Sequence, residues 1–335
     1  MRFGVGFPTC REGVAYPVPY VRPPEFPTIA RRAEELGYYS LWGNDHFTTP
    51  SVIQATQAEP PNFYEPLITY ASLIPLTRSL RFVVSVLVLP QREVILLARQ
   101  LATLDVLSGG RIVLGVGIGA YREEFEAVHP EHRGANRGRM LEEGVQGLRV
   151  LFTRRRAHFD GEYVRFGEVE LAPKPAQDPF PIHLSAHGAA ALRRAGRIAD
   201  GLIIAGVRPA QIVEATRELE VGAAESGRDA ASLSLHVQLW LSFGRDQAEA
   251  EMKLRRSQHF RRLVANHSER SEAAVIADFR AGNLFGSPEE VADQLRVFEQ
   301  AGAAHVGIVF LGQTTEEMLS DMSLFAERVM PEFGR

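Results

Sequence analysis

The stretch LARQLATLDVLSGGRIVLGVGIG, residues 97–119, decides the fold class because it joins a helical pattern directly to a strand pattern. Leucine and alanine recur at helical spacing up to Ser108. Gly109 and Gly110 follow, and glycine ends helices because it adopts the left-handed conformation without strain. The run 111–118 is apolar almost throughout, which is typical of a parallel strand covered on both faces. The stretch therefore predicts one unit of an α/β fold.

The same succession of helix, glycine and apolar run recurs along the 335-residue chain. Eight strands are predicted: Arg2–Phe7, Tyr39–Trp42, Leu80–Leu89, Arg111–Ile118, Pro181–Ser185, Gly201–Ala205, Leu233–Ser242 and Ala304–Leu311. Helical patterns separate the strands, and one more, 315–329, follows the last. Eight such units favour a closed (β/α)8 TIM barrel. The alternative is an open, doubly wound sheet.

Two segments interrupt this alternation. Residues 154–181 contain short aromatic runs around Asp160-Gly161, which indicate a small hairpin and then a proline-rich connection. Residues 245–286 are strongly charged and longer than one helix needs. We expect a single domain over residues 1–335, with both segments as insertions at the C-terminal (mouth) face of the barrel.

Composition excludes several classes of protein. The formal net charge of −4 gives no general attraction to nucleic acid or to an anionic membrane. The lone cysteine, Cys10, excludes a disulfide framework. His129 and His132 have metal-ligand spacing but no partner cluster, so we expect no metal site. No signal peptide or membrane-spanning run is evident, which favours a cytoplasmic protein.

Asp45 and His46 directly follow the second predicted strand. In a parallel barrel the carboxyl ends of the strands meet at the mouth, where active sites lie. His46 could act there as a general acid or base, with Asp45 orienting it. Alternatively, Asp45 caps a loop and His46 lies on the surface.

Gly115, Gly117 and Gly119 alternate along the fourth strand and leave one of its faces bare. A bare strand lets a flat ring approach closely, or it makes room for a neighbouring element. A third interpretation is an imperfect dinucleotide fingerprint, Gly115-x-Gly117-x-x-Ala120, which would indicate a nicotinamide dehydrogenase with an open sheet.

Ser185, Ala186, His187 and Gly188 precede a predicted helix. Free N–H groups at a helix N-terminus suit a phosphate, although Ser185 could instead be a simple N-cap. Arg133, Arg137 and Arg139 could reach an anionic group, or they could be the solvated start of a helix.

Several ordered stretches resemble one family, the bacterial luciferase-like flavin oxidoreductases. They are AEELGYYSLWGNDHF (33–47), the run 87–128, the run 158–203, GSPEEVADQL (286–295) and AGAAHVGIVF (301–310). The resemblance covers nearly the whole chain. It implies a TIM barrel that holds FMN, or the deazaflavin coenzyme F420, in its mouth.

The resemblance also implies roles for individual residues. Asp45 and His46 would lie beside the ring as catalytic residues. The cofactor-binding residues would be Ser85 and Val86, at a bulge where many members carry a cis peptide, then Gly117, Ile118 and Gly119, and, for the phosphate, Ser185, Ala186, His187 and Gly188. Relatives often have Gly-Gly-x-Ser at this last position, whereas this chain has Ala186 and His187 there; the backbone donors survive that change.

The resemblance first implies that the protein is a monooxygenase. Reduced FMN from a partner flavin reductase would react with oxygen to give a C4a-peroxyflavin that attacks a small organic substrate. The alternative is an F420-dependent reductase or dehydrogenase with His46 as the proton partner, and a second alternative is a flavin-binding protein without catalysis. Members are commonly homodimers.

Overall fold

The computed structural model describes residues 1–334, in which eight parallel strands close into a barrel. In ring order these strands are β1 (Arg2–Gly6), β2 (Ser40–Gly43), β3 (Arg81–Val88), β4 (Ile112–Gly117), β7 (Ile182–Ser185), β8 (Gly201–Ala205), β9 (Ser234–Phe243) and β11 (His305–Phe310). The pairing of β11 with β1 completes the ring. The predicted (β/α)8 TIM barrel is confirmed, each strand to within one residue at either end, and the open sheet is excluded.

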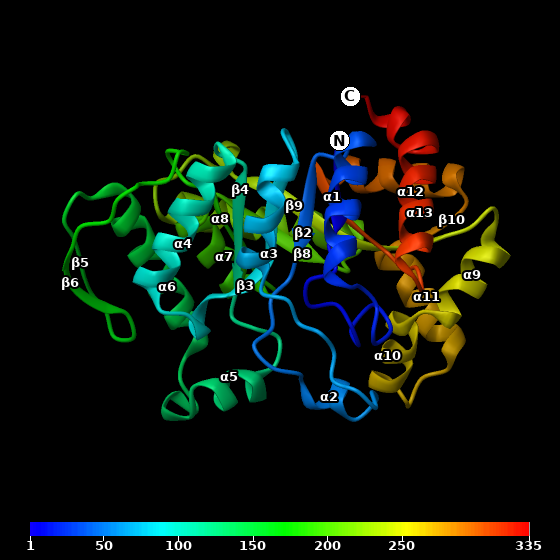
Figure 1. The fold of residues 1–335 in the computed structure, drawn as a ribbon, viewed down its shortest axis with the longest axis horizontal. Helices are drawn as coiled ribbons and strands as arrows, with labels where there is room; N and C mark the ends of the chain where they lie inside the picture. The colour runs from blue at the N-terminus through cyan, green and yellow to red at the C-terminus, as the bar shows by residue number, and fades with distance from the viewer. Residues whose placement is uncertain (335) are drawn as a thin grey trace.

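Helices surround the barrel (Figure 1). They are α1 (Phe26–Glu35), α2 (Ser51–Gln54), α3 (Pro66–Leu73), α4 (Val94–Ser108), α5 (Arg122–Val128), α6 (Arg137–Thr153), α7 (Ala189–Ile198), α8 (Pro209–Glu225), α12 (Pro288–Gln300) and α13 (Thr315–Arg328). Two short ones, α2 and α5, lie with the loops at the lower end of the barrel in Figure 1. Helix α4 ends as its sequence predicts. Gly109 has φ +68° and donates its N–H to the carbonyls of Asp105 and Val106. The chain can then turn directly into β4.

The first interruption, residues 154–181, contains the antiparallel hairpin of β5 (Ala157–Asp160) and β6 (Arg165–Val169), as predicted. The hairpin follows α6 and lies against it, because Glu143 of α6 accepts hydrogen bonds from the N–H groups of Tyr163 and Val164. It therefore projects beside the barrel, at the left edge of Figure 1. Our expectation that this insertion lies at the mouth is wrong, because the segment connects a helix end to the start of a strand.

The second interruption, residues 245–286, forms α9 (Gln247–Arg256), α10 (Gln258–Asn266), α11 (Glu272–Gly282) and a short strand, β10 (Leu284–Gly286). Helix α10 covers the loop after β1: Gln258 donates to the carbonyl of Gly13, and Arg262 donates to that of Val14. This insertion does lie at the mouth. Strand β10 pairs with the end of β9 and was not predicted.

Trp42 fills the middle of the barrel. Its indole packs with Val83, Val113 and Ile203 in a buried apolar layer. A Cβ atom on Gly4 of β1 or Gly307 of β11 would overlap the indole. The layer separates the interior into a mouth, at the carboxyl ends of the strands, and a floor, at their amino ends.

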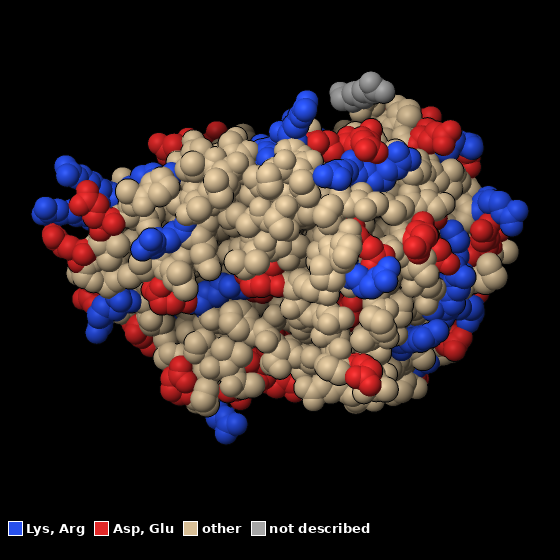
Figure 2. Space-filling view, in the orientation of Figure 1, with Lys and Arg blue, Asp and Glu red and all other residues tan. Residues whose placement is uncertain are grey.

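The surface carries both signs of charge. Figure 2 shows basic and acidic side chains interspersed over one face. Within residues 1–334, no helix combines the length and the hydrophobicity that crossing a bilayer requires.

Candidate active site

A cavity of about 460 Å³ lies at the mouth, at the carboxyl ends of β2, β3, β4 and β7. It brings together most of the predicted site residues: Asp45, His46, Val86, Gly117, Ile118, Gly119, Ser185, Ala186 and His187. Ser85 and Gly188, the other two, are each adjacent in sequence to a lining residue. Residues from four separate strand ends therefore meet at one cavity, as the barrel predicts.

His46 is held by a carboxylate that the sequence did not reveal. Its Nδ1 atom lies 3.0 Å from Oε2 of Glu124, on α5. The side chain of His46 is 12% exposed and that of Glu124 is 2% exposed. Glu124 also accepts a hydrogen bond from the N–H of Phe47, which fixes the carboxylate against the loop after β2. A carboxylate at Nδ1 keeps the proton on that nitrogen and leaves Nε2 to accept one.

Asp45 has a different role from the one we expected. Its carboxylate accepts a hydrogen bond from the N–H of Val88, at 3.0 Å, and pairs with Arg92 at 2.8 Å. It therefore fastens the end of β3 to the loop after β2. The prediction that Asp45 orients His46 is wrong, because adjacent residues in an extended loop point in different directions and Glu124 takes that place.

Ser85 and Val86 form the irregular part of β3. The peptide bond between them is cis, and the pairing of β3 with β4 shifts register between Val84 and Leu87. Val86 faces the cavity, whereas the Ser85 hydroxyl donates to Oε1 of Gln238 at 3.1 Å. The bulge and cis peptide that the resemblance implied are both present.

Arg11 lies inside the mouth and is only 3% exposed. Its guanidinium donates to Oε1 of Gln238 and to the carbonyls of Phe7 and Trp42, at the ends of β1 and β2. Within residues 1–334, no carboxylate lies within ion-pair distance of it. Burial lowers the pKa of Arg11. Arg11, Gln238 and Ser85 thus form a buried polar network that the sequence did not indicate.

The glycines of β4 serve two purposes. A Cβ on Gly115 would overlap the carbonyl oxygen of Val84, so this glycine makes room for a neighbouring strand. A Cβ on Gly117 would lie 2.8 Å from Cγ2 of Val86, at the cavity wall. Gly117 therefore leaves room for the Val86 side chain, and the two residues together line an apolar part of the cavity wall.

Helix α7 begins at Ala189, and its N-cap is Gly188, with φ +77° and no side-chain hydrogen bond. The alternative interpretation, Ser185 as N-cap, is excluded because Ser185 is the last residue of β7. The first N–H groups of a helix have no partner within it. Uncapped and beside the cavity, they can bind a phosphate.

Two arginines strengthen this anion site. Arg137 and Arg194 both line the cavity. The Nε atom of Arg137 is buried without a hydrogen-bond partner among the described residues, whereas Nε of Arg194 lies 3.6 Å from Oε2 of Glu142, in an ion pair. Arg137 donates from Nη1 to the carbonyls of Ile118 and Gly119. The other two arginines of the predicted run pair elsewhere: Arg133 with Glu126, and Arg139 with Glu143.

The cavity therefore fits a flavin or deazaflavin. The small Gly117 and the apolar Val86 line a wall that suits the ring, and the unpartnered Nε of Arg137 beside an uncapped helix, with Arg194 nearby, suits the phosphate. A metal has no such support, because residues 1–334 contain no group of three or more His, Cys, Asp or Glu side chains positioned to hold one.

Sequence reasoning missed Glu124, Arg194, Arg11 and Gln238. Glu124 stands in AYREEF, directly after the fourth strand, and that position was the available signal. Arg194 lies five residues into a helix whose start was identified. Arg11 and Gln238 become neighbours only when β1 and β9 enter one barrel.

A family model described as luciferase-like monooxygenase matches residues 1–305. Among curated proteins, an uncharacterised protein of Mycobacterium tuberculosis is 33% identical over 194 residues, which are 55% of this chain and 66% of that protein. The chain thus spans just under two thirds of that relative. An F420-dependent glucose-6-phosphate dehydrogenase of Amycolatopsis mediterranei is 26% identical over 92% of this chain and 94% of its own length.

Solved structures share the fold. The monooxygenase RslO1 of Streptomyces bottropensis has a TM-score of 0.80 and 22% identity, with all of both chains covered. The oxygenating constituent of 3,6-diketocamphane monooxygenase of Pseudomonas putida, in complex with FMN, has a TM-score of 0.72 and 16% identity over 99% of each chain. Proteins similar to this chain thus include both F420-dependent and FMN-binding enzymes.

Proposed function

The chain belongs to the luciferase-like monooxygenase family, and from this premise we propose that it is an F420-dependent oxidoreductase acting on a small alcohol or carbonyl compound. The observation that carries the proposal is the His46 imidazole, backed by Glu124, at the edge of the mouth cavity. Oxidation of an alcohol requires a base for the hydroxyl proton, and an imidazole with a carboxylate partner is suited to that task.

Different residues of the cavity would bind different parts of the cofactor. Gly117 and Val86 would hold the ring, and the start of α7 with Arg137 and Arg194 would hold the phosphate. Once bound, the deazaflavin supplies a centre that accepts or returns a hydride.

His46 moves the proton. Its Nε2 takes the hydroxyl proton of an alcohol as that alcohol is oxidised to a carbonyl, and gives it back in the reverse direction. Glu124 holds the proton on Nδ1 and stabilises the imidazolium that forms. Because Glu124 is buried and bonded to the backbone at Phe47, the dyad is oriented before substrate binds.

The near end-to-end match with an F420-dependent dehydrogenase supports this choice over FMN. The second candidate is a monooxygenase that uses reduced FMN from a partner reductase. It is compatible with the same anion site, because Arg137, Arg194 and the uncapped helix also suit the phosphate of FMN.

The test compares turnover under two conditions. Purified protein is mixed without oxygen with F420 and a panel of small secondary alcohols and sugar phosphates, and loss of the oxidised coenzyme is followed by its absorbance. In parallel, the protein receives reduced FMN, oxygen and a panel of ketones and aldehydes. We expect turnover only in the first assay, and its loss in His46→Ala. Turnover only in the second would replace the proposal by the monooxygenase.

A further inference from the structure

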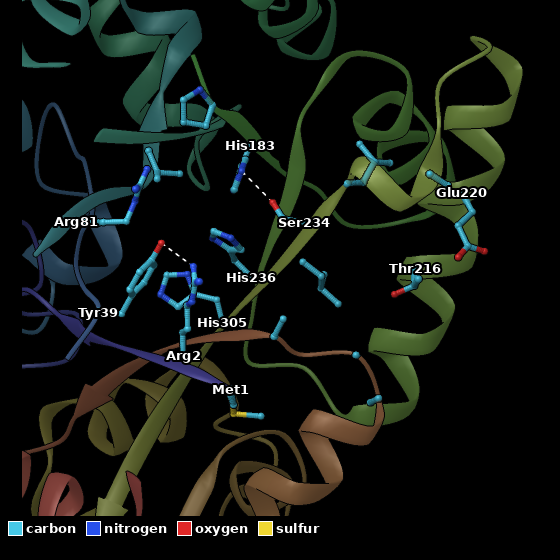
Figure 3. Close-up of a pocket in the computed structure, with 18 of the residues that line it drawn as sticks. Met1, Arg2, Tyr39, Arg81, His183, Thr216, Glu220, Ser234, His236 and His305 are labelled. Carbon is cyan, nitrogen blue, oxygen red and sulfur yellow. Dashed lines mark hydrogen bonds between the residues drawn. The ribbon is translucent and has the colours of Figure 1, made fainter. Parts of the chain in front are cut away.

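A second hollow, of about 1260 Å³, lies at the opposite end of the barrel, at the amino ends of the strands. Figure 3 shows three histidines at its centre: His183 of β7, His236 of β9 and His305 of β11. We call them the floor histidines. Arg2, Tyr39 and Arg81 flank them on one side, and Thr216 and Glu220 of α8 lie across the hollow.

The floor histidines are buried and only partly hydrogen-bonded. Their ring centroids are 4.4 Å apart between His183 and His236, and 4.6 Å apart between His236 and His305. His183 meets the hydroxyl of Ser234 at 3.1 Å, and His305 meets that of Ser40 at 2.8 Å. The Nδ1 atoms of His183 and His236 are buried with no partner in the described part of the chain. Buried polar atoms normally have partners, and the His236 ring forms no hydrogen bond within the described part of the chain, so its ring has a donor left for another molecule.

The charges around the hollow are mainly positive. Arg2 donates from Nη1 to the hydroxyl of Tyr39, and its guanidinium lies 4.4 Å from the centre of that ring, while Arg81 lies 5.9 Å from it. Arg217 of α8 is a third cation, and Glu220 is the one acidic residue among the described lining residues. A bound cation would be repelled here, whereas an anion would be attracted.

The titration behaviour of the cluster agrees with this charge balance. Burial, with contributions from His305, Arg149 and Arg81, lowers the pKa of His183 to about 3. Burial also lowers the pKa of His236 and His305, and Arg81 contributes to both. No carboxylate is among the causes for any of the three. The floor histidines therefore have no negatively charged partner among the described residues. A bound anion could supply one.

We propose that this hollow is a binding site for a small oxyanion with two or more negative charges. The guanidinium groups of Arg2 and Arg81 bind its oxygens, and the imidazole of His236 donates to it from the barrel interior. Phosphate groups and polycarboxylates share this chemistry. Guanidinium binds both through paired N–H groups.

The site is separate from the mouth. The apolar layer of Trp42, Val83, Val113 and Ile203 fills the barrel between the two hollows. Binding at the floor therefore does not compete with cofactor, and the proposal stands or falls independently of the proposed function.

Isothermal titration calorimetry of the full chain tests the proposal, with inorganic phosphate and citrate as probes at constant ionic strength. We expect saturable binding of at least one probe, with one site per chain. Arg2→Gln and Arg81→Gln should each weaken it by about tenfold or more, since each removes a charge-assisted contact. Arg99→Gln, an exposed change on α4, is the matched control and should leave affinity unchanged. Tighter phosphate binding indicates a phosphate-bearing ligand, and tighter citrate binding a polycarboxylate.

Absence of saturable binding by either probe would overturn the proposal. Equal weakening of probe binding in all three variants would also overturn it, because that result indicates only general charge attraction. Histidine-labelled wild-type protein gives a test without variants. On addition of the tighter probe, NMR signals of the floor histidines should shift and that of exposed His267 should not. Unchanged floor signals would contradict the site.

Discussion

His46 and Glu124 are 78 positions apart in the chain, yet the Nδ1 atom of one lies 3.0 Å from Oε2 of the other. His46 follows β2, and Glu124 lies on the helix after β4. The strand ends of β2 and β4 face the same mouth of the barrel, and this brings the two side chains together. The pair supplies a nearly buried imidazole with a fixed carboxylate partner, and the proposed proton transfer depends on it.

Replacement of His46 by alanine should lower kcat by about 10²- to 10⁴-fold, the usual contribution of a general acid or base. Cofactor affinity should change little, because the anion site is elsewhere in the cavity. Stopped-flow turnover and cofactor titration measure the two effects. His267→Ala, an exposed control, should have wild-type values. An unchanged kcat in His46→Ala would remove His46 from the mechanism.

Replacement of Glu124 by glutamine should lower kcat by a smaller factor, about 10- to 100-fold, since His46 remains as the base. Glutamine keeps the shape but not the charge that stabilises the imidazolium. Turnover and urea denaturation of the same variant separate the two roles of Glu124. A loss of stability with an unchanged kcat would indicate that Glu124 only maintains the loop.

Asp45→Ala should act mainly on stability. It removes the acceptor for the N–H of Val88 and a buried partner of Arg92, although Arg92 keeps Glu65 at 3.2 Å. We expect the free energy of unfolding to fall by about 2–4 kcal/mol. Urea denaturation measures this. A catalytic role for Asp45 would instead appear as a large loss of kcat without loss of stability.

Arg137→Gln and Arg194→Gln should each weaken cofactor binding by about 10- to 100-fold, since each removes a charged donor to the phosphate. Fluorescence titration gives the Kd. Arg133→Gln is the matched control, because the native Arg133 pairs with Glu126 on the surface. Equal effects in all three variants would indicate long-range charge attraction rather than a phosphate site.

Stability should fall in mild acid because of the floor histidines. Their pKa values are lowered in the folded chain, to about 3 for His183, while the unfolded chain binds protons below about pH 6.5. The unfolded state therefore binds more protons as pH falls. The free energy of unfolding should fall by up to about 1.4 kcal/mol per pH unit for each histidine below about pH 6.5. Urea denaturation of wild type and His236→Asn checks this, and equal slopes would contradict it.

The sequence was sufficient for the barrel because its signals are local. Apolar runs and the glycines that end helices, such as Gly109, recur often enough to place eight strands. Strand β10, with three residues, is too short to produce such a pattern. The hairpin at 154–181 was recognised, but its position against α6 depends on hydrogen bonds from Glu143 that no local pattern encodes.

The site was predictable where the strand ends themselves line it, as at His46, Val86 and Gly117. It was not predictable where a side chain arrives from a helix. Glu124 and Arg194 enter the cavity from α5 and α7, so their roles depend on how those helices lie over the mouth. The partner of Asp45 was missed for a different reason: Arg92 lies in the connection between β3 and α4, beyond the strand end.

The most direct measurement is a fluorescence titration of the purified protein with F420 and with FMN, each oxidised and reduced. Our account predicts tight binding of F420, weaker binding of FMN in both states, and unchanged F420 affinity in His46→Ala. Tight binding of reduced FMN alone would contradict it and make the protein an oxygen-using monooxygenase.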